Sequence, residues 1–448
     1  MDFEPGLIAR LFFRPRSHCI GGSQNSSGIR ELLYSTRLAP PAVGILQVVK
    51  KSDRFIMKKI WSLSLLTGVL LLAPSVNQGG KLFDGASKKQ LTVYLQDICR
   101  WAVDAKLSAW PGFKSGSGGM ERLAVQGGLG RALMAAGELT KDGSKYVEEA
   151  LRWGNTLVGQ QRRAQTSQGG EGGYWADASG NIELSENCMA AAALGRACAT
   201  AEGSRKKEYL QAMERLAHFL LEGTTAEPAL KRPAVGAWGA TGGEQKGAWG
   251  SGIIKETTSL LPSTRSSAAA AFFFAELYGV TRNKQYRDVA MNTVAWLLKS
   301  RHANGEFPEV VDGKEAEEIS YIGITYCTEA ILSAFYLLDD SAFNKQLPID
   351  MENTVRQLMR VQGENGVWGE GSDKLGSPGV AMLLCWYYSN PPSKPDESIP
   401  QSVDKFWQLL SNPVHAQSFG IFVNGLATAC LGVATAEMIK PGITYKKL

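Results

Sequence analysis

The chain of 448 residues has few of the side chains that usually bind metals or nucleic acids. It contains four histidines and seven cysteines, and no two cysteines form a Cys-x-x-Cys pair. Because zinc sites and disulfide frameworks are recognised by such spacings, the sequence predicts neither a metal site nor a cofactor. The formal net charge is only +5 and basic residues do not cluster, which argues against binding to nucleic acid.

A long membrane-spanning run is also missing. Residues 57–75 begin with Met57 and two lysines, continue with an apolar run of about 14 residues, and end in small residues; such a run is short for a transmembrane helix. This pattern is typical of a secretory signal peptide, although an internal apolar helix is an alternative. We expect Met57 to be the native start, residues 1–56 to be a non-native or disordered extension, and the mature protein to be secreted or periplasmic.

Four segments within residues 82–440 share one pattern. In each, a Gln or Arg precedes a glycine by four residues, and an aromatic residue follows that glycine by two. The segments recur about every 65 residues, a period that fits one long helical hairpin. The four sets are Gln168, Gly172 and Tyr174; Arg232, Gly236 and Trp238; Arg301, Gly305 and Phe307; and Gln362, Gly366 and Trp368.

Each segment lies between two stretches with different helical patterns. The stretch before it is charged and amphipathic, whereas the stretch after it is apolar and rich in small residues, as in a helix buried on all sides. The pairs span residues 87–138, 143–200, 204–279, 283–338, 350–390 and 398–437. We predict an all-α chain in which about six hairpins close into an (α/α)6 toroid. A β-sheet in the body of this domain, residues 82–440, would contradict that prediction.

The pattern Gln-x-x-x-Gly-x-Trp, complete at Gln362, Gly366 and Trp368, resembles the QW repeat of squalene cyclases and protein prenyltransferase β-subunits. The resemblance covers roughly residues 87–437 and implies an α/α toroid, while the catalytic motifs of those enzymes are absent. We expect the repeated residues to be structural. Glycine would allow a positive φ, the aromatic ring would pack against the hairpin, and Gln or Arg would bond the start of the inner helix.

The long connections before the inner helices would meet at one mouth of such a toroid. Six helix N-termini would point at this mouth, which favours an anionic or hydroxyl-rich ligand. Aromatic side chains in the connections suit sugar rings, and the glycine-rich connection at 224–261 could form a lid. The sugar-binding candidates are Trp110, Trp175, Trp249 and Phe419.

Two kinds of carbohydrate chemistry fit the polar residues near these helix starts. A glycoside hydrolase needs two carboxylates, and the candidates are Asp177, Glu186 and Glu256. A polysaccharide lyase needs a base and a group that neutralises a uronate, and the candidates are Tyr321, Arg265 and Asn187. The sequence does not decide between the two reactions.

Glu329 is a further catalytic candidate, because a carboxylate inside an apolar run must be paired, protonated or functional. It shares a helical stripe with Tyr321 and Thr325, and Arg265 is a possible partner for Glu329 or Glu256. We predict a secreted carbohydrate-active toroid that acts on a small-molecule or polysaccharide ligand. The alternatives are a non-catalytic binding or scaffold toroid and, less favoured, a terpenoid cyclase or prenyltransferase-like enzyme.

Overall fold

The computed structural model describes residues 82–83, 85–109, 121–141, 143–227, 234–239, 242–254, 257–394, 396–411 and 424–445. All of them belong to the second of two compact units, Val76–Leu448. The predicted signal peptide and the segment before it lie outside the described residues. So do four residues named above, which are Trp110, Arg232, Glu256 and Phe419.

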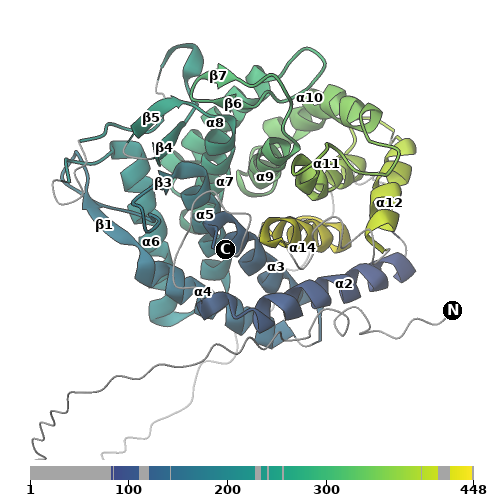
Figure 1. Cartoon of the computed structure of the whole chain (residues 1–448), viewed down its shortest axis with the longest axis horizontal. Helices are drawn as coiled ribbons and strands as arrows, with labels where there is room; N and C mark the ends of the chain where they lie inside the picture. The colour runs from purple at the N-terminus through teal and green to yellow at the C-terminus, as the bar shows by residue number, and fades with distance from the viewer. Residues whose placement is uncertain are drawn as a thin grey trace, which may run out of the picture. The chain divides into compact units, whose positions relative to one another are not determined.

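Six outer and six inner helices alternate along the described part of the chain (Figure 1). The outer helices are α2 (Gly85–Asp104), α4 (Gly143–Gln160), α6 (Gly203–Glu222), α8 (Lys284–Ser300), α10 (Ser341–Arg360) and α12 (Ser398–Ser411). The inner helices are α3 (Leu123–Leu139), α5 (Leu184–Thr200), α7 (Thr264–Thr281), α9 (Tyr321–Leu337), α11 (Ser377–Ser389) and α14 (Gly425–Ile439). Each inner helix packs against the next, and α14 packs against α3, so the predicted toroid closes.

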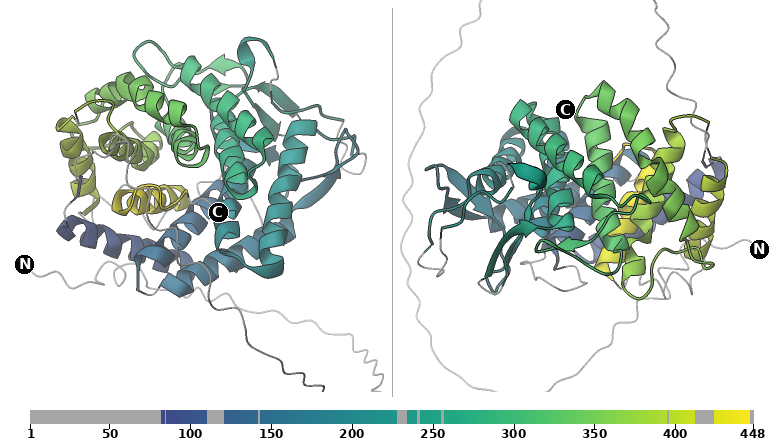
Figure 2. Two further views of the ribbon diagram at one scale, coloured as in Figure 1. Left: turned by 180° about the vertical axis from the view of Figure 1, so that it is seen from behind. Right: turned by 90° about the horizontal axis from the view of Figure 1, so that it is seen from above.

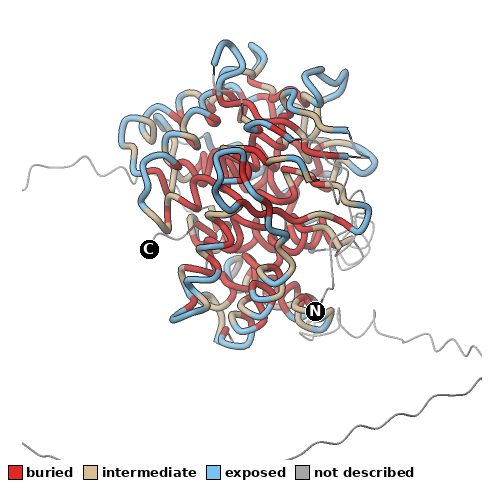
Figure 3. The backbone as a smooth tube through the Cα atoms, turned by 90° about the vertical axis from the view of Figure 1, so that its left-hand side faces the viewer, coloured by how far each residue is buried: buried red, intermediate tan, exposed pale blue. Residues whose placement is uncertain are grey.

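Small residues allow the inner helices to approach closely. A Cβ atom on Gly127 of α3 would lie 3.0 Å from the Met189 carbonyl oxygen of α5, and one on Gly128 would lie 3.1 Å from Ala429 Cβ of α14. These two consecutive glycines therefore allow both neighbours of α3 in the ring, α5 and α14, to pack closely against it. The inner helices are buried along almost their whole length, whereas the outer helices bury one face. Figure 3 shows the buried residues gathered in the interior and the exposed residues at the periphery.

Short strands occur in the connections from outer to inner helices, contrary to the prediction of a body without β-sheet. β1 (Arg162–Gln165) pairs with β2 (Glu171–Tyr174), and β6 (Val310–Val311) pairs with β7 (Lys314–Glu315). β4 (Gly250–Ile254) lies between β3 (Ile182–Glu183) and β5 (Thr257–Pro262), and all these pairs are antiparallel. The hairpins project beside the helices (Figure 2), and the ring closes without them.

Two of the repeated glycines adopt the expected left-handed backbone. Gly305 has φ +91° and Gly366 has φ +84°, and each packs against the backbone of the next outer helix. Gly172 and Gly236 have no positive φ, so the prediction is wrong for them. The aromatic residue that follows each of the four glycines is buried; these residues are Tyr174, Trp238, Phe307 and Trp368.

The Gln and Arg residues of the pattern tie one hairpin to the next. Gln362 Nε2 donates to the Ser402 carbonyl of α12 at 2.9 Å, and Arg301 Nη1 donates to Thr354 Oγ1 of α10 at 3.0 Å. These bonds reach the next outer helix and not the start of the inner helix, which corrects the predicted role. In the first of the four repeated segments, between α4 and α5, Gln161 makes the equivalent bond, to the Ala212 carbonyl of α6 at 2.8 Å, while Gln168 is exposed.

Candidate functional site

The first turns of the inner helices meet at one end of the ring, which we call the mouth. Side-chain bonds link them around the ring. Glu186 of α5 accepts a hydrogen bond from the Ala124 backbone of α3 at 2.8 Å, and Thr325 of α9 donates to the Gly376 carbonyl just before α11 at 3.0 Å. The mouth is therefore built from segments that lie far apart in the sequence.

A buried carboxylate holds an arginine on one side of the mouth. Glu186 is fully buried, and its Oε1 accepts a hydrogen bond from Arg122 Nε at 2.9 Å and a second one from Nη2. The Arg122 side chain retains 18% of its exposure. Because the carboxylate is fully buried and the arginine side chain is partly exposed, the arginine is the member of this pair that a ligand can reach.

A second pair of the same kind lies at the start of α7, two inner helices further round the ring from α3. Arg265 Nε is 2.9 Å from Glu309 Oε1, and the exposed fractions of the two side chains are 37% and 7%. Arg265 Nη2 also donates to Ser320 Oγ at 3.0 Å, and Ser320 donates to Asp373 at 3.1 Å. Arg265 was expected to pair with Glu329 or Glu256, whereas its carboxylate partner in the described part of the chain is Glu309.

The Glu309 carboxylate occupies a space that depends on a glycine. Burial raises the pKa of Glu309, and Arg265 acts in the opposite direction. A Cβ atom on Gly323, in the first turn of α9, would lie 2.1 Å from Glu309 Oε2. An alanine at this position would displace the carboxylate and with it the guanidinium of Arg265.

Tyr326 lines a narrow cavity in the centre of the ring and is near enough to both arginines for their charges to act on it. The cavity has a volume of about 30 Å³, and its polar lining consists of Thr325, Tyr326 and Glu329. Tyr326 is 4% exposed, and no described group bonds its hydroxyl. Burial raises the pKa of Tyr326 and Glu186 adds to the rise, while the guanidiniums of Arg122 and Arg265 lower it.

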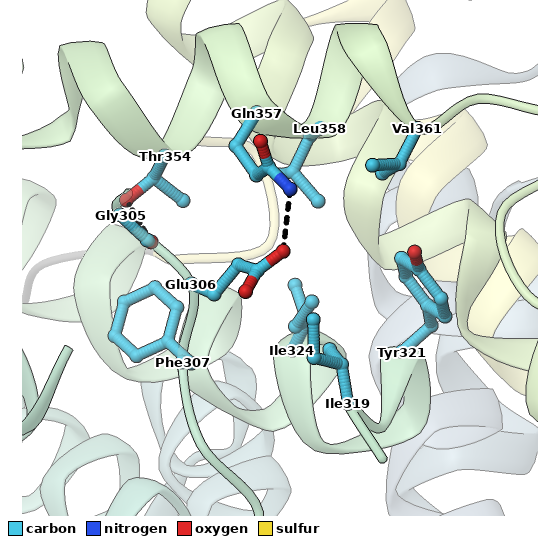
Figure 4. Close-up of a pocket in the computed structure, with 10 residues that line it drawn as sticks. All are labelled: Gly305, Glu306, Phe307, Ile319, Tyr321, Ile324, Thr354, Gln357, Leu358 and Val361. Atoms are coloured by element: carbon cyan, nitrogen blue, oxygen red, sulfur yellow. Dashed lines mark hydrogen bonds between the residues drawn. The ribbon is translucent and has the colours of Figure 1, made fainter. Parts of the chain in front are cut away.

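Tyr321 is the tyrosine named from the sequence, and it lies elsewhere than Tyr326. Tyr321 opens α9 and lines a small crevice against α10, together with Glu306 and Gln357 (Figure 4). The crevice has a volume of about 10 Å³ and is separate from the central cavity. Burial raises the pKa of Tyr321, and the nearby Asp373 raises it further. The signal for Tyr326 was its place three residues before Glu329, on the same helical face.

Glu329 forms the floor of the central cavity and is paired. Arg131 Nη1 of α3 donates to its Oε1 at 2.7 Å, and the hydroxyl of Tyr445 donates to Oε2. Tyr445 belongs to the segment after α14, and its ring stacks on Tyr336 with centroids 5.5 Å apart. The C-terminal segment covers this side of the ring, which contains Arg131, Glu329 and Tyr445. We call it the closed half.

Three other predicted site residues have structural roles. The indole N–H of Trp175 donates to the Leu157 carbonyl at 2.8 Å, and Asn187 bonds both backbone groups of Trp175. Trp249 donates from its indole to Thr293 Oγ1 at 2.9 Å. Because Trp175 and Trp249 are 2% and 4% exposed, neither has a free face for a sugar ring.

Asp177 is also committed to local structure. It is 5% exposed, and its carboxylate accepts hydrogen bonds from the backbone and the side chain of Asn181, each at 2.8 Å. These bonds close the turn before β3. Of the three carboxylates predicted for hydrolysis, Asp177 is therefore fixed in a turn, Glu186 is paired with Arg122, and Glu256 lies outside the described residues.

Comparison with known proteins agrees with this architecture. A family model for pectic acid lyase matches residues 263–368, which include Arg265, Glu309 and Tyr326. No curated protein matches the sequence.

Across the part of the chain that the structure covers, no helix is both long and apolar enough to cross a membrane, and no cluster of three His, Cys, Asp or Glu residues is arranged to hold a metal.

Solved structures share the fold at low sequence identity. A polysaccharide lyase superposes with a TM-score of 0.52 at 10% identity, covering 78% of this chain and 97% of that one. A sugar epimerase from a ruminal bacterium gives 0.51 at 14% identity, with 71% and 87% covered. An α-1,6-mannanase of Salegentibacter in complex with α-1,6-mannotriose gives 0.50 at 13%, with 78% and 99% covered.

At these identities the structural likeness establishes the α/α toroid and not the reaction, because one fold supports many chemistries. The pectic acid lyase match adds a sequence signal that falls on the mouth residues Arg265, Glu309 and Tyr326. Together the findings support the prediction of a carbohydrate-active α/α toroid, with an activity of the polysaccharide lyase or glycoside hydrolase type.

Proposed function

We propose that the protein is a polysaccharide lyase that cleaves an anionic glycan containing uronic acids at the mouth of the ring. The observation that carries this proposal is that Tyr326 lines the central cavity within electrostatic range of the two arginines, Arg122 and Arg265. Two of the three residues, Arg265 and Tyr326, fall in the segment that matches pectic acid lyase.

The arginines fit the first requirement of uronate elimination, which is neutralisation of the substrate carboxylate. Removal of the proton at C5 leaves negative charge that spreads into this carboxylate. A guanidinium with two parallel N–H donors binds a carboxylate at two points and stabilises that charge. Arg122 and Arg265 are held in place by Glu186 and Glu309, so they are oriented before the substrate arrives.

Tyr326 fits the proton-transfer requirement. In its ionised form the Tyr326 oxygen takes the proton from C5, the C5–H electron pair forms the C4–C5 double bond, and the C4–O4 bond breaks. The leaving O4 then takes a proton from the Tyr326 hydroxyl, which returns the side chain to its ionised form. Because burial raises the Tyr326 pKa, this mechanism implies activity that increases toward alkaline pH.

A glycoside hydrolase is the second candidate, supported by the likeness to the mannanase fold. Hydrolysis needs two carboxylates on either side of the scissile bond. In the described part of the mouth, the carboxylates of Glu186 and Glu309 are buried behind arginines. This arrangement favours the lyase over the hydrolase.

The test is an assay of the purified protein on polygalacturonate and on a neutral mannan, with two readouts. Elimination produces an unsaturated uronate that absorbs in the ultraviolet, whereas hydrolysis produces reducing ends without that absorbance. We expect reducing ends and absorbance to rise together on polygalacturonate. Reducing ends without absorbance would favour the hydrolase, and silence in both assays would favour a binding or scaffold protein.

Two further proposals concern the origin and destination of the chain. We propose that residues 57–75 direct export, which N-terminal sequencing of secreted protein would test by finding a start after residue 75. We also propose that the repeated Gly-x-aromatic segments reflect a relation to the toroids of squalene cyclases and protein prenyltransferases. The positive φ of Gly305 and Gly366 supports that relation.

A further inference from the structure

A wide groove lies behind the Arg265–Glu309 pair and plays no part in the chemistry above. Its volume is about 560 Å³, far larger than the central cavity. The end of β5, the last turn of α8, the 3-10 turn at Gly243–Gln245 and the β6–β7 hairpin enclose it. A groove of this size accommodates sugar residues.

The extended segment Phe307–Val311 separates the groove from the mouth. Pro308 and Val310 line the groove, while Glu309, between them, is buried and pairs with Arg265. Thr264, next to Arg265, bonds the Pro308 carbonyl at 2.8 Å and the Val310 N–H at 2.9 Å. One extended segment therefore has the mouth on one side and the groove on the other.

The lining combines apolar surfaces with polar groups at the edges. Leu261, Pro262 and Val310 offer apolar surface, and Leu261 is 57% exposed. Trp296 lies below them, with its indole bonded to Gln245 Oε1 at 3.2 Å. Apolar surface with a few polar groups around it is the usual composition of a site for a sugar, whose C–H faces are apolar and whose edges carry hydroxyls.

The charges in the groove differ from those at the mouth. Lys299 is the lining cation, and Glu244 and Glu315 are lining carboxylates. Glu315 also pairs with His302 at 2.8 Å. Whereas the mouth presents two arginines, the groove has no excess of positive charge, so it does not favour a uronate carboxylate. Its composition suits a neutral, hydroxyl-rich sugar or an esterified uronate.

We propose that this groove is a distal glycan-binding site that holds neutral or esterified sugar residues of the same chain whose uronate is cleaved at the mouth. The proposal rests on the proposed lyase function. Its consequence is a preference for long, partly esterified substrates over short, fully acidic ones, because only the long chain occupies both sites.

The test compares two leucines that are neighbours on β5. Leu261→Glu puts a charge on the apolar lining, and Leu260→Glu is the matched control, because Leu260 is also exposed, at 47%, and does not line the groove. The measured quantity is kcat/KM on a long, partly methyl-esterified oligogalacturonide divided by kcat/KM on a trimer. We expect Leu261→Glu to lower this ratio about tenfold, or about 1.4 kcal/mol, and Leu260→Glu to leave it unchanged.

Equal ratios in both variants and the wild type would overturn the proposal. Val310→Glu provides a second variant if Leu261→Glu is poorly folded, as judged by thermal unfolding. If the wild-type protein cleaves no uronate glycan, the proposed function fails, and the groove is tested separately by calorimetric titration with a fully methyl-esterified oligogalacturonide. Binding that Leu261→Glu abolishes and Arg265→Ala retains would support the groove, and absence of binding to the wild type would overturn it.

Discussion

The mouth and the closed half of the ring both contain ion pairs of arginine and glutamate, but they expose them differently. At the mouth the side chains of Arg122 and Arg265 are 18% and 37% exposed, while the carboxylates that they pair with are buried. In the closed half both partners of the Arg131–Glu329 pair are buried, at 1% and 5% exposure. The first arrangement can bind a ligand, and the second holds inner helices together.

A tyrosine lies near the ion pairs both at the mouth and in the closed half, and the two tyrosines differ in whether the hydroxyl is hydrogen-bonded. The Tyr445 hydroxyl donates to Glu329, and the Arg131 guanidinium carbon lies over the Tyr445 ring, 5.0 Å from the ring centroid. Tyr326 faces the cavity, and its hydroxyl has no bonding partner among the described residues. Both tyrosines are 4% exposed and both lie near pairs of arginine and glutamate, so the difference between them is the hydrogen bond that the Tyr445 hydroxyl makes.

The largest effect is expected from breaking the buried pair. Glu329→Ala leaves the Arg131 guanidinium buried without its carboxylate, which typically costs about 3–5 kcal/mol of unfolding free energy. Urea denaturation measures this loss. The control is Glu352→Ala, whose partner Arg356 is 72% exposed, and it should change stability by less than about 1 kcal/mol. Similar losses in both variants would show that the closed half does not stabilise the ring.

The next effect separates the two tyrosines by activity. Tyr326→Phe removes the proposed proton-transfer group and should lower kcat on polygalacturonate by about 10²–10⁴-fold. The thermal midpoint should stay near that of the wild type, because no described hydrogen bond is lost. A variant that keeps wild-type kcat would remove Tyr326 from the mechanism and leave the mouth arginines as binding groups only.

The pH dependence of the wild-type activity is a second test of Tyr326 as the proton-transfer group. Burial raises the Tyr326 pKa, so at neutral pH most of the enzyme carries the protonated, inactive hydroxyl. While the pH is below that pKa, kcat/KM should rise about tenfold per pH unit, as the ionised fraction does. Initial rates on polygalacturonate between neutral and alkaline pH measure the slope. A flat profile would contradict a tyrosine base.

The smallest effect belongs to the tyrosine of the closed half. Tyr445→Phe removes the hydroxyl that bonds Glu329 and should lower the unfolding free energy by about 1–3 kcal/mol, because a buried acceptor loses its partner. Activity measured well below the unfolding temperature should remain. Loss of activity with unchanged stability would mean that the closed half also takes part in the reaction.

Much of the fold was predictable because its signals are local. The alternation of charged amphipathic stretches with small-residue stretches indicated outer and inner helices before any contact was known. The strands were missed because β1 to β7 are only two to six residues long, and pairs such as Ile182 with Ile253 join distant connections. No short window of sequence carries the information for such a pair.

The partners of the candidate site residues could not be predicted from local signals. Arg265 was identified correctly as a residue near a helix start, but its partner Glu309 was not, because the partner depends on how the connection folds back. Tyr321 was named as a candidate and Tyr326, five residues further along α9, was not considered. The choice depends on which face of α9 turns to the centre, and the neighbouring helices set that rotation.

The sequence by itself determined the hairpin repeat, the division into inner and outer helices, and the closed α/α ring, since helical periodicity and residue size act over a few residues. Only the tertiary structure decided which charges are buried. Arg122 meets Glu186, 64 residues further along the chain, and Arg131 meets Glu329, 198 residues further along. Whether a guanidinium reaches the solvent depends on what packs around it, and that packing exists only once the ring has closed.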